Sequence, residues 1–214
     1  MTLPMTVVSR CRVCGATSQQ TRLASTNEFG SPDMDLRPPE MRRSTMWAWL
    51  EECPECGYVA ADLADPSPVP ASFLETEAYK TCDGLCFVSD LAPRFYRAHM
   101  LAVRSGDFRH AMHHALETAW LCDDRGDADN ARHCRNIAAE YMDNLRLRSP
   151  EDETLMVMHL DILRRARRFD DVLAVHSRMN VQHLPDLITA LIAFEVEKAK
   201  QHDDARYTVA QAAG

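Results

Sequence analysis

The chain has little glycine and no long apolar run, and each shortage excludes a class of function. Only seven of its 214 residues are glycine. None belongs to a phosphate-binding loop, a dinucleotide fingerprint or the Gly-x-Ser-x-Gly turn of a hydrolase. No apolar stretch approaches the ~18 residues that cross a bilayer. The opening MTLPMTVVSR also lacks the basic start and apolar core of a secretion signal. We therefore expect a cytoplasmic protein without a membrane partner.

Clustered basic residues are also scarce, which disfavours nucleic acid as a partner. The formal net charge is −8, whereas neutralising phosphates takes clustered lysine and arginine. The segment Met1–Pro70 contains no lysine, and its acids outnumber its arginines. The longest basic run, RRARR (Arg164–Arg168), is followed closely by Asp170 and Asp171. We interpret this run as a solvated helix end.

Cysteine, by contrast, is plentiful, and its spacing indicates a metal site. Two Cys-x-x-Cys-Gly motifs occur, one at Cys11 and Cys14 and the other at Cys53 and Cys56. Each motif presents two thiolates from a tight turn, and four thiolates form the closed tetrahedral shell typical of structural Zn²⁺. In a reducing compartment, metal ligands are more common than disulfides. We therefore predict structural zinc, and we rank an iron–sulfur cluster, a redox pair and a disulfide below it.

The long interval between the two motifs indicates an inserted segment. We expect residues 1–65 to form a zinc-ribbon-like module, although the motifs lie farther apart than the ~15–20 residues of a compact ribbon. The excess is placed at Asn27–Ser44, here called the excursion, which has turn residues and no sustained period. TMWAWLEE (Thr45–Glu52) is predicted to be a strand that leads into the second motif. SQQTRLAST (Ser18–Thr26) is predicted to pair with it.

The remainder, residues 66–214, is predicted to be a helical domain that follows a proline-rich linker at Ala64–Pro70. Apolar residues recur here at intervals of three and four, which is the helical period. The expected helices lie around Ala92–Ser105, Phe108–Cys122, Ala131–Leu145, Ser149–Leu163, Phe169–Met179 and Leu184–Lys200. For the fourth of these helices, Ser149 is the expected cap and Pro150 the first helical residue.

Three joints between the expected helices share a pattern. SGDFRHA (Ser105–Ala111) and RGDADNA (Arg125–Ala131) both carry Gly-Asp, and ARRFDDV (Ala166–Val172) is a looser copy. Glycine can take a left-handed turn, and aspartate can cap the next helix. The joints resemble the corners of tetratricopeptide repeats, but the two glycines lie too close together for a tandem repeat. We predict an α+β, mostly α fold in which a zinc-ribbon-like module precedes an antiparallel tetratricopeptide-like array.

The N-terminal part resembles a known bacterial family. Three features carry the resemblance: the first Cys-x-x-Cys, the proline-rich stretch DMDLRPPEMRR and the closing CPECGY. They are similar to the domain-of-unknown-function 2225 family over roughly residues 8–65. The resemblance implies a metal-binding N-terminal module fused to helices. It implies no reaction and no catalytic residues.

The excursion contains candidate partner-binding residues. Arg37, Arg42 and Arg43 flank a Pro-Pro-Glu sequence that contributes Glu40. These charges have two interpretations. They can form ion pairs within their own domain, or they can recognise a partner, because loops held on rigid scaffolds often carry binding residues.

A second group of candidates lies in the helical part. His110, His114 and Glu117 are spaced to share one helix face and are candidate ligands of a second metal ion. The acid of a His-Glu-x-x-His protease motif is missing between the histidines. The remaining cysteines are interpreted as core residues rather than a second four-thiolate site: Cys82, Cys86, Cys122 and Cys134.

No catalytic residue is assigned. We predict a zinc-stabilised interaction or scaffold protein that binds a protein or peptide partner, and not an enzyme. One alternative is a metal-dependent hydrolase that uses the histidine pair, with the cysteine site structural. The other is a nucleic-acid-binding ribbon, which the net charge disfavours. The sequence does not define the oligomeric state.

Overall fold

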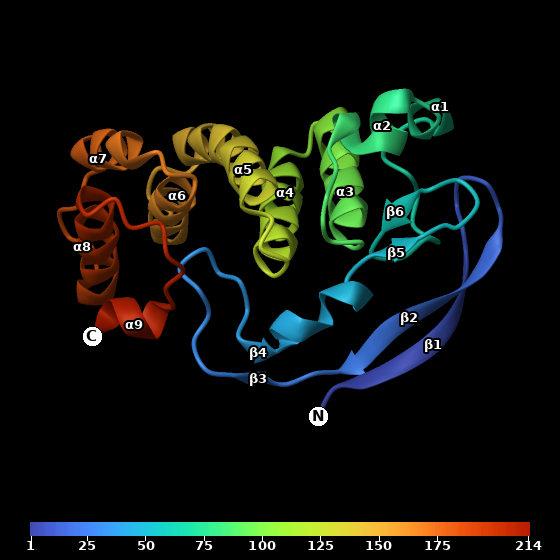
Figure 1. Ribbon diagram of the computed structural model, residues 1–214, viewed down its shortest axis with the longest axis horizontal. Coiled ribbons are helices and arrows are strands. Elements are labelled where there is room, and N and C mark those ends of the chain that lie inside the picture. The colour runs from blue at the N-terminus through green and yellow to red at the C-terminus, as the bar shows by residue number, and fades with distance from the viewer.

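Most of the chain is helical, and the helices stand side by side in an arc in the computed structural model, which describes residues 1–214 (Figure 1). The strands are β1 (Leu3–Arg10), β2 (Thr17–Ser25), β3 (Glu28–Phe29), β4 (Glu40–Met41), β5 (Glu51–Glu52) and β6 (Val59–Ala60). The 3-10 helices are η1 (Arg42–Ala48) and η2 (Cys82–Gly84). The α-helices are α1 (Ala71–Leu74), α2 (Glu77–Thr81), α3 (Ala92–Ser105), α4 (Phe108–Asp123), α5 (Ala128–Arg148), α6 (Glu153–Arg165), α7 (Phe169–Ser177), α8 (Asp186–Lys200) and α9 (Val209–Ala213). No helix combines the length and apolar composition needed to cross a bilayer. The α+β, mostly α prediction is confirmed.

The strands form three separate antiparallel pairs rather than one sheet. β1 pairs with β2, β3 with β4, and β5 with β6. The first pair is a long ribbon whose register runs from Leu3 opposite Ser25 to Arg10 opposite Thr17. The third pair is short and flanks the second cysteine motif. The strands therefore do not form a common sheet.

The predicted strand at Thr45–Glu52 is wrong, because most of this segment lies in or next to η1. Only its last two residues pair, with β6. Buried Met46 and Leu50 lie four residues apart, and the Trp49 indole donates to the Thr45 hydroxyl at 3.0 Å. Both spacings belong to a helix. The apolar run lacks the alternation with polar residues that distinguishes a half-buried strand.

The predicted partner of SQQTRLAST (Ser18–Thr26) is also wrong, since β2 pairs with β1 instead. The segment still touches the second motif, because the Gln20 amide donates to the Glu52 carbonyl at 3.0 Å. Strand β1 lies just before β2 in the sequence, and the turn that holds the first cysteine motif brings β2 back beside β1. A local hairpin thus forms in place of the longer-range pairing.

Successive helices from α3 to α8 pack against one another, and the predicted joints are well formed. Gly106 and Gly126 take left-handed conformations with φ of 78° and 70°. Asp107 and Asp127 cap the helices that follow, by accepting hydrogen bonds from backbone N–H groups three residues on. Each of these aspartates also donates its own N–H to the carbonyl five residues back, which closes the preceding helix.

The third joint has the same geometry without glycine. Arg167 takes the left-handed conformation with φ of 64°, and the Arg168 N–H donates to the Leu163 carbonyl at 2.9 Å. No side chain caps α7.

One expected cap is wrong, because Asp152 rather than Ser149 caps α6, accepting from the Leu155 N–H at 3.1 Å. The preceding helix α5 extends far enough to leave Ser149 at its C-terminal end.

The excursion runs along the inner side of the helical arc and reaches its far end (Figure 1). There the Met34 N–H donates to the Tyr207 carbonyl at 3.0 Å, and the Val209 N–H donates to the Pro32 carbonyl at 2.9 Å. The chain around Met34 is buried. The division between residues 1–65 and residues 66–214 stays a prediction, and these contacts cross it.

A buried ionic network fastens the excursion to the helices. Asp35 is 1% exposed, and it accepts from the Trp120 indole at 2.8 Å and from Arg165 at 2.9 Å. Arg165 also donates to Asp123 at 2.6 Å, and Arg135 meets the same carboxylate. The network therefore joins three helices, α4, α5 and α6, to one residue of the excursion.

The interpretation of RRARR as a solvated helix end is wrong for its first two residues. Arg164 is fully buried, and the side chain of Arg165 is 7% exposed. Arg164 pairs with Asp161 at 2.7 Å and with Glu195 at 2.5 Å. Asp161 lies one turn before the run, and Glu195 lies far from it in the sequence. The charge pattern within the run therefore does not reveal the acids that pair with its buried guanidinium.

Replacing Asp35 with alanine should lower the free energy of unfolding by about 3–5 kcal/mol, because it leaves buried groups of Arg165 and Trp120 without their acceptor. Urea unfolding followed by circular dichroism measures this loss. As a matched control, Glu28→Ala breaks the exposed ion pair with Arg42 and should cost less than about 1 kcal/mol. Equal losses in the two variants would contradict a dominant role for the buried network.

Candidate metal centre

The two Cys-x-x-Cys-Gly motifs fold into turns of the same design. The first cysteine of each motif donates its N–H to the carbonyl five residues on, at 2.8 and 2.9 Å. Its own carbonyl accepts from Gly15 or Gly57 at 2.9 Å in both turns. These glycines have φ of 77° and 69°, a region that other residues enter at a cost. Each turn therefore holds its two cysteine side chains on one side.

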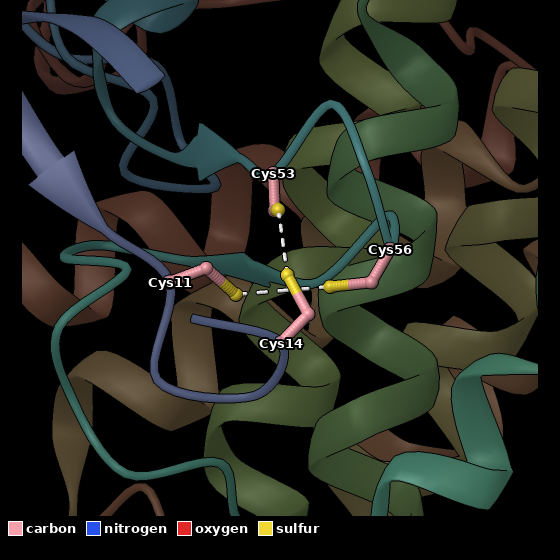
Figure 2. Close-up of side chains that lie close together, drawn as sticks. All are labelled: Cys11, Cys14, Cys53 and Cys56. Carbon is pink, nitrogen blue, oxygen red and sulfur yellow. Dashed lines mark hydrogen bonds between the residues drawn. The ribbon is translucent and has the colours of Figure 1, made fainter. Parts of the chain in front are cut away.

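The four cysteine sulfurs point toward a common centre (Figure 2). Cys11 Sγ lies 3.7 Å from Cys56 Sγ, and Cys14 Sγ lies 3.6 Å from Cys53 Sγ. All four sulfurs lie within 4.8 Å of one another. A regular tetrahedron with metal–sulfur bonds of ~2.3 Å has sulfur–sulfur edges of about 3.8 Å. The predicted ligands are thus brought together at a spacing that fits one metal ion.

The environment of the sulfurs differs from one cysteine to the next. Burial raises the pKa of Cys53 and of Cys56. The backbone N–H of Ala16 holds the pKa of the exposed Cys14 below its ordinary value. Since a metal ion binds thiolates, it must displace protons that the raised pKa values favour, and binding releases those protons. We infer that metal affinity falls as the pH is lowered.

The metal centre is fastened to the helices by residues that no sequence motif marks. The Tyr79 hydroxyl on α2 donates to the Gly57 carbonyl at 2.7 Å. Arg94 and Arg97 on α3 both pair with Glu52, the residue just before the second motif, at 3.3 and 2.5 Å. The sequence does contain an acid next to a cysteine motif and two arginines three residues apart on an expected helix. Nothing in the sequence indicates that they pair with one another.

A buried acid braces the loop between the second motif and the linker. Glu51 is 3% exposed and accepts from the Arg22 guanidinium at 2.6 Å and from the Leu63 N–H at 2.9 Å. The Leu63 carbonyl in turn accepts from the Arg12 N–H at 2.8 Å, inside the first motif. Both cysteine turns therefore share one set of supporting contacts.

The histidine pair does not form a second cluster of ligands. His110 Nδ1 contacts Asp107 at 2.7 Å, whereas His114 Nδ1 contacts Glu117 at 2.7 Å. The two rings lie 6.2 Å apart at their centroids. Both line a cavity of about 320 Å³ between the metal centre and α3 and α4. Only the four cysteines bring three or more His, Cys, Asp or Glu ligand atoms close together.

Two candidate residues of the excursion point inward. Arg37 is 1% exposed and donates to both carboxylate oxygens of Asp124, at 2.9 and 2.5 Å. Arg43 pairs with the buried Asp33 at 2.6 Å. These contacts belong to the first of the two interpretations, in which the charges hold the loop against its own chain.

The other two candidates face solvent. Arg42 pairs with Glu28 at 2.7 Å, and the two side chains are about half exposed. Glu40 is exposed and accepts from the Ser44 hydroxyl at 2.6 Å. An exposed ion pair of this kind contributes little to stability. Both charges are therefore available to another molecule.

The remaining cysteines are free thiols and stand apart from the metal centre. Cys82, Cys122 and Cys134 are buried, and burial raises the pKa of Cys122 to about 12. They agree with the interpretation as core residues. Cys86 does not agree with this interpretation, because it is exposed. It lies in the loop between η2 and α3.

Replacing Cys53 with serine should abolish stoichiometric metal binding, because three thiolates no longer close the tetrahedron. It should also loosen residues 1–65, since metal binding in small modules contributes directly to folding. Elemental analysis of the purified variant measures the metal content. Cys134→Ala removes a buried thiol elsewhere and should keep the metal. Equal metal loss in both variants would show that the four ligands are wrongly assigned.

Comparison of the chain with protein-family models, with curated proteins and with solved structures finds no match. The resemblance to the domain-of-unknown-function 2225 family therefore stays a prediction from the cysteine motifs and the proline-rich stretch between them. What is established about the metal centre comes from the geometry of its four cysteines and the contacts around them.

Proposed function

We propose that the chain is a zinc-stabilised scaffold that binds a protein or peptide partner. The observation that carries the proposal is the closed set of four sulfurs within 4.8 Å of one another. When four thiolates surround Zn²⁺, no position is left for water or substrate, so such a site stabilises a fold rather than catalysing a reaction. The metal then holds the two ends of the intervening segment, including the excursion, in one place.

Zinc is the proposed metal because the sulfurs are spaced for a single ion. An iron–sulfur cluster inserts its own irons and sulfides between the cysteines, so its ligand sulfurs must stand farther apart. The contacts at 3.6 and 3.7 Å are close to the tetrahedral edge for one ion. Zn²⁺ is also redox-inert and accepts tetrahedral thiolate coordination readily.

The helical part is proposed to act as a tetratricopeptide-like array. Three of its joints carry the same backbone hydrogen bond, from the N–H after a left-handed residue to the carbonyl five residues back. The first two of these joints share helix α4, and successive helices from α3 to α8 pack as neighbours. Stacked helices of this kind present extended surfaces that other proteins bind.

The exposed residues of the excursion are proposed as the partner-binding surface. It exposes Phe29 at 62% and Leu36 at 43%, next to the half-exposed side chain of Arg42. A cavity of about 360 Å³ lies beside these residues, where the excursion and Trp49 meet Glu117 and Trp120 of α4. The fitting partner is a protein segment with an acidic side chain, which takes the place of Glu28 at Arg42, and an apolar neighbour.

Purified protein should contain about one zinc per chain, because one tetrahedral site uses all four cysteines. Elemental analysis tests the stoichiometry. Removal of the metal with a chelator should lower the unfolding temperature, and added Zn²⁺ should restore it. Iron in place of zinc would overturn the choice of metal, and stable protein that never contains metal would overturn the site.

Charge reversal at Arg42 should weaken partner capture and leave zinc content and helicity unchanged, because its ion pair is exposed and lies outside the helices. Such rim charges act mainly on association rate and salt dependence. The measurement is affinity capture, followed by titration of the identified partner with purified protein. The control Arg132→Glu reverses a partly exposed charge on α5, paired with the exposed Asp129, and should keep full capture. Loss of zinc or early melting in Arg42→Glu would instead assign Arg42 to the fold.

A further inference from the structure

A third cavity lies where α5, α6 and α7 meet, and it shares no lining residue with the metal centre or the excursion. Its volume is about 450 Å³. Helix α5 supplies three of its lining residues, α6 supplies His159, and α7 and the residue after it supply two more. The lining residues are Asp143, Arg146, Leu147, Pro150, His159, Val175 and Arg178.

Two basic side chains in this cavity carry buried nitrogens without partners. His159 is 2% exposed, and neither of its ring nitrogens has a hydrogen bond within the chain. The Nε of Arg146 is likewise buried and unpartnered. Buried polar side-chain atoms in folded proteins nearly always have a partner. Unpartnered donors on adjacent walls of one cavity indicate a ligand with acceptor atoms.

The charge of the cavity is positive although the chain as a whole is acidic. Arg146 and Arg178 form no ion pair within the chain, whereas neighbouring Arg168 is paired with Asp171 at 2.6 Å. Asp143 supplies the single negative charge of the lining, and its side chain is 61% exposed. With two arginines and one aspartate, the lining keeps a net positive charge, although solvent screens the exposed Asp143 and Arg178 alike.

His159 is a neutral donor rather than a cation. Burial is the largest of the causes that lower its pKa to about 3; Arg146 and Arg168 act in the same direction, and Asp171 opposes them. The contact of 3.4 Å between His159 Nε2 and Asp143 is therefore not an ion pair at neutral pH. Burial also lowers the pKa of Arg146, and Asp143 offsets this only in part. The Arg146 guanidinium thus lacks a full counter-charge.

We propose that this cavity binds an oxyanion, a carboxylate or a phosphate carried by a small organic molecule, held between Arg146 and Arg178. A guanidinium donates two parallel hydrogen bonds to either group, and a ring N–H of His159 donates a further one. Leu147, Pro150 and Val175 line the remainder, where the carbon skeleton of the ligand would lie. This site is independent of the metal centre and of the partner-binding surface.

The test uses the full metal-loaded chain, with inorganic phosphate and acetate as separate probes at constant ionic strength set with sodium chloride. Isothermal titration should show saturable binding of at least one probe, and the stronger probe identifies the ligand group. Arg178→Gln should weaken that binding by about tenfold or more. Arg178 is exposed, so this variant should keep its fold. Arg148→Gln removes a charge from the same end of α5 outside the cavity and should bind normally.

A change of opposite sign sharpens the test. Asp143→Asn removes the carboxylate that repels an anion and should strengthen binding by about threefold. The ring nitrogens of His159, followed by ¹⁵N NMR, should shift on addition of the probe in the wild-type chain. Three results would overturn the proposal: no saturable binding of either probe, unchanged affinity in Arg178→Gln, or weaker binding in Asp143→Asn.

Discussion

The carboxylate of Asp35 lies in the interior, where it accepts hydrogen bonds from the Trp120 indole and the Arg165 guanidinium. Because Arg165 shares Asp123 with Arg135, one residue of an otherwise irregular segment sets the positions of three helices. A buried charge is costly unless it is fully paired, so each member of the network requires the others. The course of the excursion along the arc follows from this requirement (Figure 1).

The metal centre and the buried network act on different parts of the same segment. The cysteine motifs bring together, at the four sulfurs, the two ends of the segment that separates them and contains the excursion. Asp35 holds its middle against α4 and α6. Closing a long loop lowers the entropy of the unfolded chain, and burying its middle supplies the contacts that the loop cannot make alone. An irregular segment without a sustained period is ordered in this way.

Features that depend on local sequence were predictable, and those that depend on distant partners were not. The period of three and four places α3 at Ala92–Ser105, as expected, and Gly-Asp joints form where glycine and aspartate occur. The cysteine spacing likewise brings the four sulfurs together. The run Arg164–Arg168 is different, because the acids that pair with Arg164 are Asp161 on α6 and Glu195 on α8. Nothing within the run distinguishes a solvated charge from a paired one.

The same reasoning separates arginines that build the fold from arginines that remain for a ligand. The chain has more acids than bases, so a buried or half-buried arginine without a carboxylate is not explained by a lack of acids. Arg37, Arg164 and Arg165 have all found partners within the chain. Arg146 and Arg178 have not, although they line one cavity with the unpartnered ring of His159. The buried arginines elsewhere form ion pairs within the chain. The half-buried Arg146 and the exposed Arg178 beside it are therefore best explained by a counter-charge from outside the chain.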